Sequence, residues 1–323
     1  MRAVVVEQTG GPEVLLVKDL EPPVPGPGEV LVEVAAAGVN FIDIYKRTGV
    51  YAMELPFVSG SEGAGRVSAL GEGVTGVAVG DPVAWAMVDG GGYAEQVVVP
   101  ADRVVPVPDG TDLETAAAVM LQGMTAHFLS ESTYPARAGQ TALVHATAGG
   151  VGLLLTQMLS AKGVRVIGTT STQEKEDLAR RAGADEVVRY TETDLVEEVR
   201  RLTGGRGVDV VYDGVGRATF GAGLDVLVPR GMMVLFGAAS GPVPPLDPQV
   251  LNSKGSLYLT RPSLTHYIAT REELLERAGA VLGQVASGAL DVRVGSRYSL
   301  EEAGRAHEDL AGRRTTGKLL VVP

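Results

Sequence analysis

Residues 145–152, HATAGGVG, have the composition of a loop that binds phosphate groups. The dinucleotide-binding pattern G-x-G-x-x-G places its second and third glycines on Gly149 and Gly152, and its first on Thr147. Glycines let the backbone approach a pyrophosphate, and a helix that begins there presents its N–H groups to the anion. The segment predicts either a nucleotide site with a variant first turn or a tight turn that binds nothing.

The elements expected around this loop favour a nucleotide site. An apolar strand at 141–146 precedes it, and a helix at 151–161 follows. Further strands are expected at 164–170, 186–190, 208–216 and 232–237, with helices at 173–182, at 194–202 and up to Leu227. Strands that alternate with helices are typical of βαβ units, so we expect an α/β fold with a doubly wound parallel sheet.

The end of the second strand of this sheet indicates which cofactor binds. Sites for NAD usually carry an acidic residue there for the ribose hydroxyl. This chain has GTTST at 168–172, with Ser171 and no carboxylate, and Lys175 follows. Small hydroxyl residues and a cation favour the 2′-phosphate of NADPH. The alternative is that Lys175 is a solvated surface lysine, because acidic residues flank it at 174, 176 and 177.

The rest of the chain has a different pattern. Residues 1–120 contain short β-branched runs separated by Gly, Pro and Asp, which is typical of a barrel-like, all-β domain. A helix with an acidic first turn is expected over 112–130, helices over 271–287 and 300–310, and a last strand at 318–323 that returns to the β domain. We therefore expect residues 1–122 and 263–323 to form the β-rich domain, and residues 123–262 the nucleotide-binding domain.

Composition excludes several classes of protein. The 323 residues include no cysteine, which excludes disulfides, cysteine-bound zinc and thiol nucleophiles. The four histidines are far apart, so we expect no metal site. A net charge of −11 disfavours nucleic acid and anionic membrane surfaces as partners. With no secretory signal and no long apolar run, a cytoplasmic protein without a membrane partner is expected.

The whole chain resembles the zinc-free, zeta-crystallin-like quinone oxidoreductases of the medium-chain dehydrogenase/reductase superfamily. The segments that carry the resemblance are AAAGVNFIDIYKRTGVY (35–51), GSEGAGRV (60–67), GGYAEQVVVPADRVVPVP (91–108), QGMTAH (122–127), YDGVG (212–216), LYLTRPSL (257–264) and RRTTGK (313–318). The loop fits this group's A-x-x-G-x-x-G variant through Ala146, Gly149 and Gly152. The resemblance implies a Rossmann cofactor domain and a GroES-like barrel domain.

The zinc-binding branch of this superfamily has a cysteine ligand after the glycine that corresponds to Gly38, and a histidine in a G-H-E motif. This chain reads Gly38-Val39-Asn40 and Gly60-Ser61-Glu62 at these places. Both zinc ligands are therefore replaced, and the resemblance implies catalysis without a metal.

The resemblance also implies roles for individual residues. Asn40 and Asp43 would line the site near the nicotinamide, and Tyr51 would lie at the substrate mouth. The expected cofactor-binding residues are Thr125, Ala146, Gly149, Gly150, Val151, Gly152, Ser171, Lys175, Tyr190, Phe236, Gly237 and Arg313.

Several of these residues have a structural alternative. Asn40 could be a turn residue or helix cap, Asp43 a first-turn acid, and Tyr51 a half-buried barrel residue. His145 ends a buried strand, so we expect a structural, hydrogen-bonded histidine there.

The resemblance implies hydride transfer from C4 of NADPH to a quinone, which needs no metal to polarise it. A proton must arrive from solvent or a nearby hydroxyl, and Tyr51 is a candidate donor. Two alternatives remain: reduction of the conjugated double bond of an enal, enone or acyl thioester, and a non-enzymatic NADPH-binding protein with a structural or RNA-binding role.

A homodimer is expected through an edge strand at 233–237 or 256–260.

Overall fold

The computed structural model describes all 323 residues, which form two compact units. The first unit comprises Met1–Met124 and Tyr267–Pro323, and the second comprises Thr125–His266. Each unit has its own sheets and its own apolar core.

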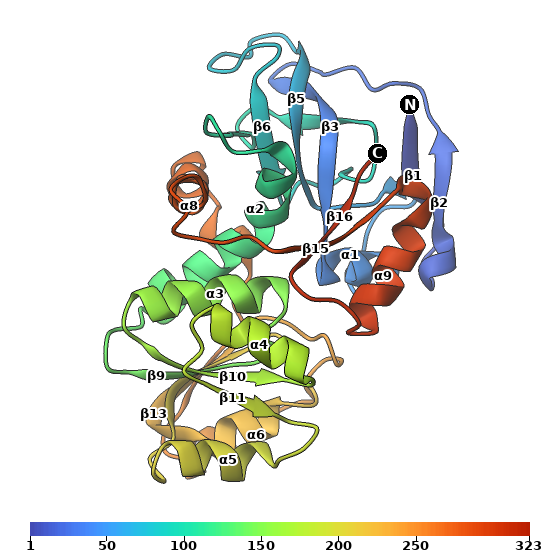
Figure 1. Ribbon diagram of the computed structural model, residues 1–323. Helices are drawn as coiled ribbons and strands as arrows, with labels where there is room; N and C mark the ends of the chain where they lie inside the picture. Colours follow the sequence, from blue (N-terminus) through green and yellow to red (C-terminus); the bar gives the residue numbers. More distant parts are fainter. The chain divides into compact units, whose positions relative to one another are not determined.

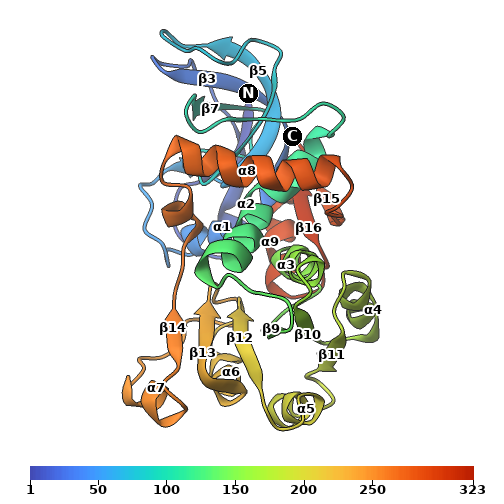
Figure 2. The same ribbon diagram turned by 90° about the vertical axis from the view of Figure 1, so that its left-hand side faces the viewer.

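The second unit contains a six-stranded, fully parallel sheet in the order β11-β10-β9-β12-β13-β14 (Figure 2). Its strands are β9 (Thr141–Val144), β10 (Arg165–Thr170), β11 (Glu186–Arg189), β12 (Val208–Asp213), β13 (Leu227–Leu235) and β14 (Tyr258–Thr260). The direction of the chain through the sheet reverses between β9 and β12. This arrangement confirms the expected doubly wound sheet, in which ligands bind beyond the carboxyl ends of the strands next to such a reversal.

Helices cover both faces of this sheet (Figure 1). The helices α3 (Gly150–Ala161) and α4 (Gln173–Arg181) lie on one face, and α5 (Leu195–Leu202) and α6 (Phe220–Asp225) lie on the other. All residues of β9 and β12 are buried, as expected for strands covered on both faces. The helix expected up to Leu227 ends at Asp225, because Leu227 already belongs to β13. A short helix, α7 (Gln249–Ser253), was not expected.

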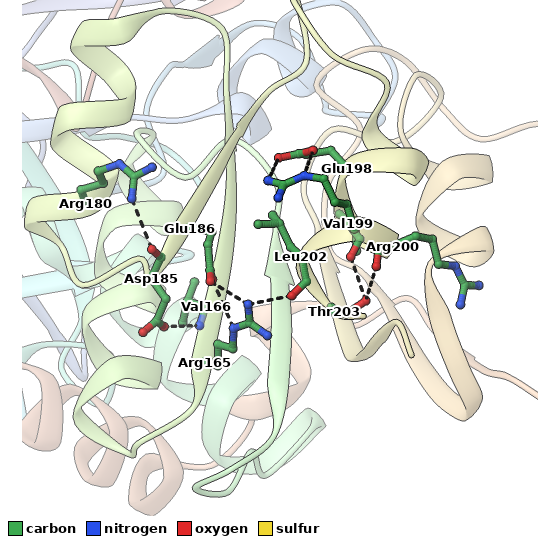
Figure 3. Close-up of polar contacts among 11 residues, drawn as sticks. Arg165, Val166, Arg180, Asp185, Glu186, Glu198, Val199, Arg200, Leu202 and Thr203 are labelled. Carbon is green, nitrogen blue, oxygen red and sulfur yellow. Dashed lines mark hydrogen bonds and ion pairs between the residues drawn. The ribbon is translucent and has the colours of Figure 1, made fainter. Parts of the chain in front are cut away.

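Arg165 ties together three elements at the amino ends of the strands (Figure 3). Its guanidinium donates to both carboxylate oxygens of Glu186 on β11, at 2.6 and 3.2 Å, and to the carbonyl of Leu202 at the end of α5, at 3.0 Å. Next to it, Asp185 accepts from the backbone N–H of Val166 at 2.8 Å. These pairs stabilise the amino-terminal ends of the strands, whereas a nucleotide is expected at their carboxyl ends.

The first unit is built from two sheets. One has the order β15-β16-β3-β5-β6-β8 with β7 paired to β3, and the other has the order β2-β1-β4. The strands are β1 (Arg2–Val6), β2 (Leu15–Asp19), β3 (Glu29–Val39), β4 (Phe57–Val58), β5 (Glu62–Leu70), β6 (Pro82–Ala86), β7 (Gln96–Pro100), β8 (Val105–Pro106), β15 (Val294–Tyr298) and β16 (Lys318–Val321). Because β16 pairs with β3, the C-terminal segment completes the sheet that the N-terminal segment begins.

The region expected to be all-β contains a helix, α1 (Phe41–Arg47). It begins at a capping box formed by Asn40 and Asp43, a strong local signal for a helix that outweighs the β-branched residues around it. The strand β15 was also not expected. The other helices are α2 (Leu113–Phe128), the π-helical turn η2 (Leu129–Thr133), α8 (Arg271–Ala286) and α9 (Ala303–Ala311), together with the 3-10 turns η1 (Pro12–Val14), η3 (Leu264–Tyr267) and η4 (Leu300–Glu302). None of the helices combines the length and the apolar character that a membrane crossing requires.

Candidate functional site

The loop after β9 makes its turn at Ala146 and not at Thr147. Ala146 has a left-handed backbone with φ of 52°, a conformation that usually requires glycine. Thr147 is fully buried, and its hydroxyl donates to the carbonyl of Val144 and accepts from the N–H of Thr169, both at 2.8 Å. The first glycine of the G-x-G-x-x-G template thus falls on a side chain that ties β9 to β10, which agrees with the A-x-x-G-x-x-G variant.

The other small residues of the loop bring the start of α3 against the backbone. A Cβ at Gly152 would lie 2.4 Å from the carbonyl oxygen of Ala146, so only glycine fits there. Gly149 is the N-cap of α3, no side chain caps the helix, and its first turn contains no acidic residue. The N–H groups of Gly150 and Val151 therefore face the loop at the positive end of a helix dipole, as an anion site requires.

Hydroxyl groups follow the carboxyl end of β10. Ser171 is half-buried, and Thr172 caps α4 by accepting from the N–H of Lys175 at 3.3 Å. Tyr190, after β11, has its ring 44% exposed, and its N–H donates to the carbonyl of Thr170 at 3.2 Å. Lys175 and Tyr190 thus belong to the first turns beyond two adjacent strands, where the ribose end of a dinucleotide is expected.

The acidic residues next to Lys175 bind other groups. Glu176 pairs with Arg180 at 2.8 Å and with Arg189 at 3.2 Å. Asp177 accepts from Gln173 at 2.8 Å. Glu176 is therefore neutralised by two arginines, whereas Asp177 is held by a neutral amide.

Asp213, at the end of β12, organises the next two loops and was not among the residues expected at the site. Its carboxylate accepts from the N–H groups of Val215 and Gly216 at 2.7 and 3.0 Å, and its carbonyl accepts from the N–H of Phe236 at 2.8 Å. A Cβ at Gly237 would lie 2.4 Å from the carbonyl oxygen of Gly214, so this pair of loops packs tightly. The YDGVG segment was the signal that could have identified Asp213.

His145 is buried where β9 ends. Its Nδ1 lies 3.2 Å from the hydroxyl of Thr169, and its Nε2 has no partner. Burial lowers the pKa of His145, and the nearby Asp213 opposes that shift. The expected hydrogen bond is therefore present on one nitrogen.

In the first unit, Asn40 is buried and fully engaged with neighbouring groups. Its backbone N–H donates to Asp43 at 2.9 Å, so Asn40 caps α1 and Asp43 is an acidic residue of its first turn. Its amide nitrogen donates to Glu62 at 2.8 Å and to the carbonyl of Gly38 at 3.2 Å, and its amide oxygen accepts from Lys318 at 2.8 Å. The orientation of the Asn40 side chain is therefore fixed by three polar partners.

Glu62 and Lys318 form a buried ion pair beside Asn40. Glu62 also accepts from the N–H of Leu121 at 2.6 Å, so both of its carboxylate oxygens are engaged. A Cβ at Gly38 would clash with both side chains. Neither Glu62 nor Lys318 was among the expected site residues, although GSEGAGRV and RRTTGK contain them.

These groups do not fit zinc. The positions at which the zinc-binding branch carries its ligands hold the amide of Asn40 and the hydroxyl of Ser61, and zinc prefers thiolate, imidazole or carboxylate. The carboxylate of Glu62 is already bound to an ammonium. No three His, Cys, Asp or Glu side chains are grouped so that they could hold a metal ion.

Asp43 is buried at a junction of hydrogen bonds. One carboxylate oxygen accepts from Ser61 at 2.6 Å, and the other accepts from the hydroxyl of Tyr93 at 3.2 Å. Tyr93 in turn lies 3.1 Å from Nε2 of His307, whose Nδ1 lies 3.3 Å from the guanidinium of Arg47. Burial raises the pKa of Asp43, although the hydrogen bond from Ser61 opposes the shift.

Tyr51 lies apart from this network. Its ring is 41% exposed and packs edge-on against Tyr45, with 5.5 Å between centroids, while Tyr45 packs against Phe41 at 6.2 Å. The three rings form a row in which Phe41 and Tyr45 are half-buried and Tyr51 is exposed.

Thr125 and Arg313, the two other residues expected to bind the cofactor, differ in their exposure. Thr125 is buried in α2, and Arg313 is exposed with a left-handed backbone, φ 56°, after α9. The roles that the resemblance implies for both stay predictions.

Comparison with known proteins identifies relatives over the whole chain. The family described as "Alcohol dehydrogenase GroES-like domain" matches residues 26–109, and the family described as "Zinc-binding dehydrogenase" matches residues 150–279. A quinone oxidoreductase of Pseudomonas aeruginosa is 48% identical, with 97% of each chain covered. A 2-haloacrylate reductase of a Burkholderia species is 38% identical, covering 99% of this chain and 98% of that one. The crystal structure of Escherichia coli quinone oxidoreductase complexed with NADPH has a TM-score of 0.98 at 43% identity, with both chains fully covered.

Proposed function

The chain belongs to the quinone oxidoreductases of the medium-chain dehydrogenase/reductase superfamily, and from this premise we propose that it is an NADPH-dependent, zinc-independent quinone reductase. The observation that carries the proposal is the loop after β9. It keeps the left-handed turn at Ala146 and the close contact at Gly152, and no acidic residue lies at the end of β10. This combination suits a dinucleotide with a 2′-phosphate.

Bound NADPH supplies a hydride from C4 of its nicotinamide. The chain's own groups bind and orient it: the N–H groups at the start of α3 take the pyrophosphate, and Ser171, Lys175 and Tyr190 take the adenosine phosphate. Asp213 supports this arrangement by fixing the loop on which Phe236 and Gly237 rest. The structure of a relative solved with NADPH supports the choice of cofactor.

A quinone is an acceptor that this chain can reduce without a metal ion. Its ring accepts a hydride without a Lewis acid, and the groups around Glu62 do not fit a metal. The reaction consumes NADPH, the quinone and one proton, and yields NADP⁺ and the hydroquinone. We propose that Tyr51 contacts the acceptor and that Asn40 and Asp43 shape the polar site. Tyr51→Phe tests the part of the hydroxyl as a proton donor: an unchanged turnover and pH profile would remove it.

A second candidate function is the reduction of a conjugated carbon–carbon double bond. The observation that favours it is the relative described as a 2-haloacrylate reductase, since an acrylate carries such a bond. The hydride chemistry is the same in both reactions, and the shape of the acceptor pocket decides between them.

We also propose a homodimer, in the cytoplasm, that forms through β14. Of the two segments expected at a sheet edge, residues 233–237 begin within β13, which β12 and β14 flank on either side, so this segment cannot be the edge. The strand β14 is one of the two edge strands of this sheet, and its Tyr258 and Leu259 are 58% and 37% exposed. Leu259→Lys should convert a dimer into a monomer in light scattering, and Leu275→Lys, at an exposed leucine on α8, is the control.

The decisive experiment follows NADPH oxidation by absorbance, with 9,10-phenanthrenequinone in one cuvette and a simple enal in another. Fast quinone turnover that prefers NADPH to NADH and is unaffected by a chelator supports the proposal. Turnover of the enal without the quinone would assign the chain to the double-bond reductases. NADPH binding without either turnover would favour a non-enzymatic role.

A further inference from the structure

Lys46 is a buried cation whose contacts connect the protein surface with Asp43. Its ammonium donates to Asp89 at 2.8 Å and to the hydroxyl of Ser61 at 3.0 Å. Ser61 donates in turn to Asp43 at 2.6 Å. The side chain of Asp89 is 73% exposed and that of Lys46 10%, whereas Ser61 and Asp43 are buried. A single row of hydrogen bonds therefore runs from solvent to a buried carboxylate.

The hydrogen bonds of this row point in one direction. The hydroxyl of Ser61 accepts from Lys46 and donates to Asp43, so a proton taken up on one side can be passed on at the other. Each link is within the range over which a positioned group transfers a proton. The geometry is thus that of a relay, with Ser61 as its middle member.

We propose that Asp89, Lys46 and Ser61 carry a solvent proton to Asp43 and so replace the proton that each reduction of a quinone consumes, a role that rests on the proposed function. The ammonium of Lys46 gives a proton to Oγ of Ser61 while the hydroxyl proton of Ser61 moves to Oδ1 of Asp43. The neutral amine then regains a proton from solvent beside Asp89. The protonated Asp43 then gives this proton to the oxygen anion that hydride transfer leaves on the quinone. Lys46, Ser61 and Asp43 thus end in their starting states, and the quinone gains one hydride and one proton.

Groups from several elements surround Asp43 and its hydrogen-bond partner Tyr93. They are Lys46 and Arg47 on α1, Ser61 and Glu62 at the start of β5, Tyr93 before β7, His307 on α9 and Lys318 on β16. Burial raises the pKa of Asp43 and so favours the protonated carboxyl, while Lys46 and Lys318 favour the anion.

A second branch leaves Asp43 through Tyr93 and His307, but it ends on Arg47, which is 5% exposed and keeps its proton. The branch through Lys46 is therefore the one that reaches an exposed group. This difference assigns the proton supply to Lys46 and not to His307.

Ser61→Ala interrupts the relay at its middle. We expect kcat with 9,10-phenanthrenequinone to fall on the order of 10²-fold, as for the loss of a positioned proton transfer. Because proton transfer then limits turnover, the solvent deuterium isotope effect on kcat should rise, and the effect of deuterium at the transferred position of NADPH should fall towards 1.

The matched control is Ser68→Ala on β5, the strand that begins directly after Ser61. The Ser68 hydroxyl donates to the carbonyl of Leu31 at 3.3 Å, outside the relay. It should leave both isotope effects unchanged. A residue with a merely structural role would alter stability without moving the isotope effects. The relay is therefore refuted if Ser61→Ala keeps the pH profile and both isotope effects of the wild type.

Asp89→Asn tests the relay at its exposed end, where folding is not at risk. We expect a several-fold lower kcat that rises again as the concentration of imidazole buffer is increased, because a small buffer molecule can deliver the proton to Lys46. Asp109→Asn, in an exposed turn, should show neither effect. Wild-type rates for Asp89→Asn at every buffer concentration would overturn the relay, even if Ser61→Ala failed to fold.

The experiments distinguish a failure of the proposed function from a failure of the proposed proton path. If the wild-type protein does not oxidise NADPH with a quinone, the proposed function is wrong. If the wild type turns over and the relay variants match it in rate, pH profile and isotope effects, the proton path is wrong and the proposed function stands.

Discussion

Lys318 and Glu62 form an ion pair in which neither side chain is more than 1% exposed. They come from β16 and β5, which lie on either side of β3, and both contact Asn40. Charges this deeply buried require partners, since desolvation can exceed their mutual attraction. The amide of Asn40 and the N–H of Leu121 supply additional hydrogen bonds.

Lys318→Met should destabilise the protein strongly. It leaves the carboxylate of Glu62 buried without its cation, a change that typically lowers the free energy of unfolding by about 3–5 kcal/mol. Adding Glu62→Gln to that variant removes the unpaired charge and should recover part of the loss. Denaturant unfolding of the two variants measures this, and a Lys318→Met protein as stable as the wild type would contradict it.

Gly152→Ala should weaken NADPH binding. Its Cβ would lie 2.4 Å from the carbonyl oxygen of Ala146, so the loop must move away from α3 and misplace the N–H groups of the anion site. Loss of one charge-assisted hydrogen bond, about 1.5–3 kcal/mol, weakens binding by at least about 10-fold. A fluorescence titration measures this. The control, Gly221→Ala, adds a Cβ with no neighbour within 4 Å and should keep the wild-type affinity.

Ala146→Gly should stabilise the protein and retain NADPH binding. The left-handed backbone at φ 52° is unfavourable for alanine and readily adopted by glycine, a difference of about 1 kcal/mol. The greater flexibility of glycine in the unfolded chain offsets part of this gain. A thermal unfolding temperature below that of the wild type would show that the turn does not strain Ala146.

Lys175→Ala should reduce the preference for NADPH over NADH. If the ammonium contacts the 2′-phosphate, its removal weakens NADPH binding about 10-fold or more and leaves NADH binding unchanged. The control is Lys162→Ala, which removes a lysine at the C-terminal end of α3, far from the loop after β9. Lys162 forms an ion pair with Glu131. Equal losses for both cofactors in Lys175→Ala would indicate a role unrelated to the 2′-phosphate.

His307 should make stability depend on pH. Burial, with a smaller contribution from Arg47, lowers the pKa of His307 to about 3, against an ordinary value of 6.5. Between these values the unfolded chain binds a proton that the folded protein excludes. The stability contributed by neutral His307 is therefore complete above about pH 6.5 and is lost as the pH falls towards 3, by about 1.4 kcal/mol per pH unit at most.

Asp43 changes the pH dependence of the stability in the opposite direction, because burial raises its pKa. The measurement therefore compares the wild type with His307→Gln at each pH. The free energy of unfolding of the wild type should fall relative to that of the variant as the pH drops below 6.5. His266→Gln, at an exposed histidine, is the control substitution. If the difference in unfolding free energy between the wild type and His307→Gln were constant with pH, folding would not change the proton affinity of His307.

Local sequence patterns predicted most of the second unit. The alternation of apolar strands and amphipathic helices gave the parallel sheet, and the small residues at Ala146, Gly149 and Gly152 placed the tight loop between β9 and α3. The first unit was harder to predict, because the helix α1 lies within a β-rich region and its capping box at Asn40 and Asp43 also suited a turn.

The sequence by itself determined what depends on neighbouring residues: the sheet, the loop at the start of α3 and the loss of both zinc ligands. The tertiary structure decided which distant side chains meet. Lys318 contacts Glu62 and Asn40 across 256 and 278 residues, and Lys46 reaches Asp89 across 43. Periodicity and capping report backbone conformation over a few residues, whereas a lysine or a glutamate is usually a surface residue. Only the pairing of β16, β3 and β5 buries Lys318 and Glu62 side by side next to Asn40.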